Sequence, residues 1–110
     1  MTQWEHGELF MVFNPHNAAN MRVEFVHYSI EGVGRSRIYT PTTADGDAGA
    51  IVHRMFDVFD QQIALLGTQG WEMIQSQPLP ALQAARAGAP PGGGIESWHI
   101  WFKRPAGAGT

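Results

Sequence analysis

The chain of 110 residues contains no cysteine. This absence excludes disulfide bonds, thiolate nucleophiles and every metal site that depends on cysteine ligands. It also fits a reducing compartment. Glu5, His6 and Glu8 stand where a secretory signal would be basic and then apolar, so we expect a cytoplasmic protein.

Positive charge is scarce as well. Lys103 is the only lysine, and 7 Lys and Arg stand against 10 Asp and Glu, for a formal net charge of -3. Nucleic-acid binding requires a dense positive field to neutralise phosphates, so this composition argues against it. Arg35 with Arg37, and Lys103 with Arg104, form two small basic spots that are typical of a solvated sheet edge.

The chain also lacks any apolar run near the ~20 residues that a membrane-spanning helix needs. Hydrophobic residues nevertheless make up 44% of the sequence and charged residues 15%, which is the composition of a globular domain with apolar surface to spare. The length suits one domain, which we expect over residues 1–105. Residues 78–94 are rich in Pro, Gly and Ala and form a predicted insertion loop, with one helical turn over 81–87, and residues 106–110 form a short flexible tail.

The N-terminal half predicts strands. Apolar residues alternate over 4–13, and a second strand is expected over 21–30 after a loop around Asn14 and Pro15. Gly32, Val33 and Gly34 predict a turn, and residues 35–39 follow as a short edge strand.

One long helix is predicted after these strands, from near Ala48, with Asp47 as its N-cap. Its buried face is marked by apolar residues at three- and four-residue steps: Val52, Met55, Phe56, Phe59, Ile63 and Leu66. Val58 and Leu65 widen this stripe beyond what one sheet face requires, which predicts a second contact such as another subunit.

The helix should end on Gly67 and Gly70, whose backbone freedom suits a helix exit, and Trp71 should place its ring where the next strand meets the helix. We expect strands over 71–77 and 95–104 as antiparallel neighbours. The whole pattern predicts an α+β fold: an antiparallel sheet of four to five strands with one main helix packed on one face, in the order strand, strand, helix, strand, strand.

Alternation divides the last strand into two faces: Trp98, Ile100 and Phe102 on one, and His99, Trp101 and Lys103 on the other. If the Trp98 face meets the helix, Trp101 and His99 point to the uncovered side. A large aromatic ring there suits a subunit interface or a ligand shelf.

Two segments of the chain resemble a known family: Gly70-Trp71-Glu72-Met73-Ile74 after the helix, and Phe102-Lys103-Arg104-Pro105 at the end of the last strand. The pattern is similar to that of the small bacterial family catalogued as domain of unknown function 4177, with its "GWEL" turn and final strand. Met73 replaces the usual leucine, and the 78–94 insertion is longer than expected. The resemblance implies an architecture and no catalytic residues.

Histidines are the main candidates for chemistry. His6, His27 and His99 fall on three predicted strands, and imidazoles from neighbouring strands can converge on a metal ion, although their spacing matches no metal motif. His53 and Asp57 stand four apart on the helix, where such a pair orients a catalytic base or simply stabilises the surface.

These observations favour a non-enzymatic interaction or accessory module that self-associates or binds a protein partner. Its expected surface comprises Trp101, His99, Val58 and Leu65, and no cofactor, nucleic acid or membrane is expected. One alternative is a small-molecule-binding or enzymatic domain, with an aromatic pocket between helix and sheet and His27, His53 or His99 as its polar group. A second alternative is a metal-binding domain that uses His6, His27 and His99.

Overall fold

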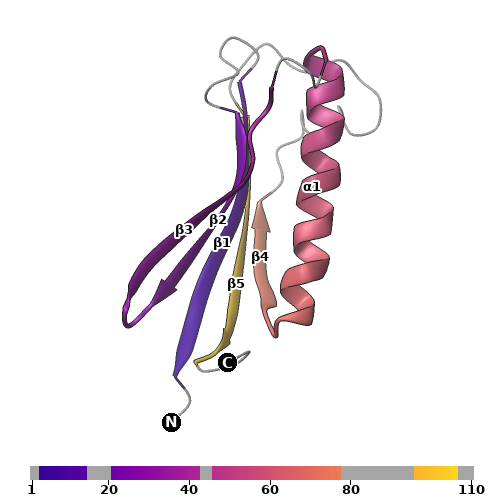
Figure 1. The fold of residues 1–110 in the computed structure, drawn as a ribbon. Coiled ribbons are helices and arrows are strands. Elements are labelled where there is room, and N and C mark those ends of the chain that lie inside the picture. Colours follow the sequence, from indigo (N-terminus) through magenta and orange to yellow (C-terminus); the bar gives the residue numbers. More distant parts are fainter. Residues whose placement is uncertain (1–2, 15–20, 43–45, 78–95, 107–110) are drawn as a thin grey trace.

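The computed structural model describes residues 3–14, 21–42, 46–77 and 96–106. It confirms an α+β fold, in which one helix packs on one face of a five-stranded antiparallel sheet (Figure 1). The elements in chain order are β1 (Trp4–Phe13), β2 (Arg22–Ser29), β3 (Gly32–Tyr39), α1 (Ala48–Thr68), β4 (Glu72–Gln77) and β5 (Glu96–Pro105). In space the strands run β3-β2-β1-β5-β4, so the last strand lies beside the first at the centre of the sheet.

The β2–β3 hairpin is tighter than predicted. The predicted turn over residues 32–34 is wrong, because Gly32 to Gly34 already pair with β2 and begin the edge strand. The turn consists of Ile30 and Glu31 between paired Ser29 and Gly32. Gly32 has φ +137°, a conformation that a side chain would disfavour, so this glycine serves the hairpin.

The helix begins as predicted and ends later. The Asp47 side chain accepts a hydrogen bond from the Ala50 amide at 2.9 Å and caps the first turn. Gly67 does not end the helix, which continues to Thr68 with Gln69 as its C-cap. Gly70, with φ +86°, provides the exit into β4.

The core lies between α1 and the covered face of the sheet. Its most buried side chains come from the helix stripe and from the three inner strands β1, β2 and β5: Leu9, Met11, Phe13, Val23, Met55, Phe59 and Ile100. Trp71, just before β4, is 6% exposed and closes the core beside the helix end. The predicted helix stripe and the predicted position of Trp71 are therefore confirmed.

Gly7 in β1 lies beneath two aromatic rings on the covered face. A Cβ atom at this position would stand 2.5 Å from Cζ of Phe25 and 3.4 Å from Cη2 of Trp71. We expect Gly7→Ala to displace the Phe25 ring from its edge contact with Trp71 and to lower the free energy of unfolding by about 1–3 kcal/mol. Chemical denaturation measures this change.

Gly34→Ala is the matched control, because a Cβ there meets nothing within 4 Å and its φ is not positive. The double variant Gly7→Ala/Phe25→Leu should lose less stability than the sum of the two single variants, since leucine lacks the clashing Cζ. Equal stability of Gly7→Ala and wild type would show that the ring moves without cost.

Within the described ranges, no helix combines the length and the apolar character needed to cross a bilayer. The predicted insertion loop with its helical turn lies outside the described residues, as does the tail after Ala106.

Candidate functional site

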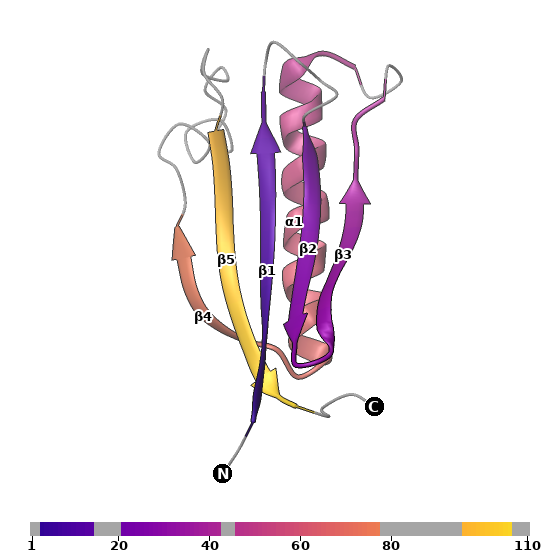
Figure 2. The ribbon, with the colours of Figure 1, turned by 90° about the vertical axis from the view of Figure 1, so that its left-hand side faces the viewer.

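The sheet has one covered and one uncovered face. Trp98 on β5 points toward the helix, where its ring packs against Phe59 and, edge-on, against Phe56, and its Nε1 donates to Ser76 Oγ at 3.0 Å. Strand alternation then places His99 and Trp101 on the opposite face, as expected. No described element lies over that face, which Figure 2 presents to the viewer with α1 behind the sheet.

Aromatic rings stack in pairs on the uncovered face. The Trp101 ring on β5 stacks with Tyr28 on β2 at 6.0 Å, reaching across β1 between them. Phe10 of β1 stacks in turn on the His99 ring at 5.3 Å. Val26 on the same face is only 1% exposed, so this surface is packed and held in shape although no described helix covers it.

Charged groups flank the rings. Glu24, 6% exposed, has three guanidinium groups near its carboxylate: Arg35 Nη1 at 3.2 Å, Arg22 Nε at 3.6 Å and Arg37 Nε at 3.8 Å. The arginine side chains outnumber the carboxylate they surround, so this corner of the face is positive in a chain whose net charge is -3. Arg35 and Arg37, which the sequence assigned to a solvated edge, are 65% and 53% exposed.

The three candidate metal-binding histidines do not converge. His27 points to the covered face and contacts Glu5, whereas His99 points to the uncovered face and contacts Glu8 at 2.6 Å. His6 pairs with Lys103 in the sheet rather than with another histidine. In the residues that the structure describes, no group of three His, Asp or Glu side chains could hold a metal ion.

The helix contributes fewer exposed side chains to the predicted interaction surface than expected. Val58 is 7% exposed and belongs to the core, so it cannot line an interaction surface of this fold, whereas Leu65 is 46% exposed. The long helix packs deeply enough on the twisted sheet to bury a wider stripe than one face was expected to need. His53 and Asp57 are both exposed, and the described contacts include no hydrogen bond between them.

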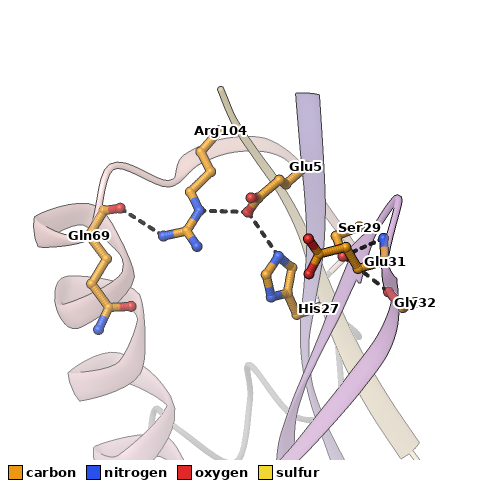
Figure 3. A network of polar contacts seen from close by, with 7 residues as sticks. All are labelled: Glu5, His27, Ser29, Glu31, Gly32, Gln69 and Arg104. Carbon is orange, nitrogen blue, oxygen red and sulfur yellow. Dashed lines mark hydrogen bonds and ion pairs between the residues drawn. The ribbon is translucent and has the colours of Figure 1, made fainter. Parts of the chain in front are cut away.

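A second polar site lies where α1 ends above the start of β1 (Figure 3). Glu5 Oε2 accepts from Arg104 Nε at 2.9 Å and lies 2.8 Å from His27 Nε2. Arg104 also donates through Nη1 to the carbonyl of Gln69, the helix C-cap, at 3.1 Å. Its guanidinium lies 4.3 Å from the centre of the Trp71 ring, and the His27 ring meets Trp71 edge-on. One arginine therefore ties together the helix end, β1 and β5.

A pocket of about 540 Å³ adjoins this network beyond the end of the helix. Its wall includes Glu5 and His27, and the β2–β3 hairpin contributes Ser29, Ile30 and Glu31. The pocket is thus near one of the candidate histidines, but it lies at the strand ends and not between helix and sheet as the alternative hypothesis expected.

Sequence reasoning missed Glu5, Glu31 and Arg104 as a set. Each stands at the end of a strand or in a turn. Arg104 reaches Glu5 because β5 pairs with β1 along its whole length, and Glu31 lines the same pocket as Glu5 from the β2–β3 hairpin. The one signal in the sequence was Arg104, the basic residue before Pro105 in the pattern that resembles domain of unknown function 4177. Comparison with protein-family models, with curated proteins and with solved structures found no match, so that resemblance stays a prediction.

Proposed function

We propose that this protein is a non-enzymatic interaction module that pairs, through the uncovered face of its sheet, with the same face of a second copy. The observation that carries the proposal is the packed platform of Tyr28, Trp101 and the arginines around Glu24. Tyr, Trp and Arg are the residue types that dominate binding energy at protein interfaces. Side chains already held by stacking also lose little entropy on binding.

The charge pattern of the uncovered face is compatible with its pairing with the same face of a second copy. A two-fold axis along β1 places β3 of one copy over β4 of the other and β2 over β5, because the sheet order is β3-β2-β1-β5-β4. Arg35 and Arg37 on β3 then face the edge strand that carries the exposed Glu72. Tyr28 of one copy similarly faces the strand that carries Trp101 of the other.

The size of the face agrees with such pairing. Its strands are 6 to 10 residues long. With five strands about 4.8 Å apart and a rise of about 3.3 Å per residue, each copy offers a face of roughly 600 Å². Two such faces bury on the order of 1,200 Å², the lower end of the range for specific protein interfaces.

The oligomeric mass tests this proposal. We expect native mass spectrometry and light scattering to give a dimer at micromolar concentration. Trp101→Ala should raise the dissociation constant by about 30-fold, as loss of a central aromatic anchor does. Glu72→Lys should also weaken the dimer, because it sets a positive charge against the arginines of the other copy.

Asp57→Lys is the matched control for charge, because Asp57 is exposed on the far side of the helix and should leave the dimer unchanged. Circular dichroism verifies that each variant is folded. Two results would contradict the pairing of two like faces. One is a wild-type protein that stays monomeric at high concentration, and the other is a protein whose oligomers become ever larger as its concentration rises.

A further inference from the structure

The pocket at the strand ends has the volume of a small-molecule site. Its 540 Å³ falls within the ~300–1,000 Å³ of typical ligand pockets. It opens beyond the C-terminal end of α1, between the start of β1, the β2–β3 hairpin and Ala106. The interaction face proposed above involves different residues, so a ligand here constitutes a separate activity.

One wall of the pocket is fixed by the polar network. The Glu5 carboxylate, whose side chain is 14% exposed, accepts from Arg104, whose side chain is 16% exposed. An ionised carboxylate only accepts hydrogen bonds, so the His27 nitrogen 2.8 Å away must carry a proton and donate. Arg104 is fixed in turn by the Gln69 carbonyl and by the Trp71 ring. This wall is therefore preorganised, and the charge of Glu5 is already balanced by Arg104.

The opposite wall carries the Glu31 carboxylate, for which the described part of the chain provides no cationic partner. The backbone amide of Glu31 donates to Ser29 Oγ at 3.2 Å, which holds the hairpin turn. The described contacts give its carboxylate no ion pair, and Figure 3 shows it turned toward the side where His27 and Glu5 lie. Among the described residues that line the pocket there is no lysine or arginine, so we expect the Glu31 carboxylate to favour cations there.

Two large apolar side chains also line the pocket, beside the polar Gln3 and Ser29. Trp4 is 45% exposed and Ile30 is 93% exposed, and both line the pocket. The Trp4 ring already attracts one cation, since Lys103 Nζ lies 4.5 Å from its centre, and Lys103 is not among the residues lining the pocket. An indole and an aliphatic side chain beside one carboxylate suit a ligand with an apolar body and an ammonium group.

We propose that this pocket binds a small organic cation, a primary amine with an apolar body, whose ammonium pairs with Glu31 while its body lies against Trp4 and Ile30. The Glu5, His27 and Arg104 network forms the rigid back wall. The ligand is held by one charge-assisted hydrogen bond and by apolar contact.

Three probes of one shape test the proposal: benzylamine, benzyl alcohol and benzoate, which are cationic, neutral and anionic. We expect benzylamine to bind with a millimolar dissociation constant, as a compound of this size can. In ¹⁵N NMR spectra it should shift the Trp4 indole N–H and leave that of Trp98, whose ring packs on the helix side, unchanged. Benzyl alcohol should bind about ten-fold more weakly and benzoate not at all.

Glu31→Gln supplies the decisive variant, since it keeps the shape of the side chain and removes its charge. It should weaken benzylamine about ten-fold and leave benzyl alcohol unchanged. Asp57→Asn, a change at an exposed carboxylate on α1 that does not line the pocket, is the control and should bind like wild type. The proposal is overturned by the absence of any Trp4 shift at about 10 mM benzylamine, by equal binding of amine and alcohol, or by an unchanged Glu31→Gln variant.

Discussion

Phe59→Ala is expected to lower the free energy of unfolding by about 3–5 kcal/mol. Phe59 lies in the middle of α1, its side chain is 0% exposed, and its ring packs 5.4 Å from that of Trp98. Removing the ring leaves a cavity between the helix and the central strands that the rigid sheet cannot fill. A domain of this size has about 5–15 kcal/mol of stability in all, so the variant should unfold at much lower urea concentration.

Gln61→Ala, an exposed change in the same helix, is the control and should stay within about 0.5 kcal/mol of wild type. Because glutamine and alanine both favour helices, the comparison isolates the buried ring. A loss below ~1 kcal/mol for Phe59→Ala would mean that the helix does not dock on the sheet as described.

Arg104→Met is expected to lower the free energy of unfolding by about 2–4 kcal/mol, the second-largest effect. The substitution keeps an unbranched apolar chain against Trp71 but withdraws the guanidinium from the Glu5 carboxylate and the Gln69 carbonyl. The Glu5 side chain is only 14% exposed, so water replaces the lost donor poorly at its carboxylate. Urea denaturation measures the loss.

A double-mutant cycle separates charge from packing at this site. Glu5→Gln removes the charge that Arg104 balances, so Glu5→Gln/Arg104→Met should lose less stability than the two single changes added together. Arg104→Lys keeps the charge but lacks the planar fork that spans Glu5 and Gln69, and it should be intermediate. Strict additivity of the two losses would show that Arg104 acts through packing alone.

The two segments that resemble domain of unknown function 4177 are in contact in the fold. Trp71 follows the glycine exit of the helix, and Arg104 stands near the end of the last strand, yet the Arg104 guanidinium lies over the Trp71 ring. Trp71 and Arg104 are far apart in the sequence, but in the fold they form a single joint whose contacts hold α1, β1 and β5 together. This joint adjoins the pocket, because Glu5, which accepts from Arg104, and His27, which meets Trp71, both line it.

Predictions from the sequence succeeded where the pattern is local. The Asp47 cap, the apolar helix stripe and the division of β5 into a Trp98 face and a Trp101 face depend on neighbours a few residues apart. They failed where a glycine has more than one use. Gly67 was expected to end the helix and Gly34 to form a turn, but glycine can also continue a helix or an edge strand when its neighbours pair.

The sequence by itself determined the composition of the core, the single long helix and the antiparallel α+β class, because each follows from periodicity and from capping residues. Only the tertiary structure decided that β5 inserts beside β1, since strand order depends on long-range pairing that no local pattern encodes. That pairing brings Arg104 to Glu5, and its register places His99 on the face opposite to His27. The uncovered aromatic face and the pocket at the strand ends both follow from it.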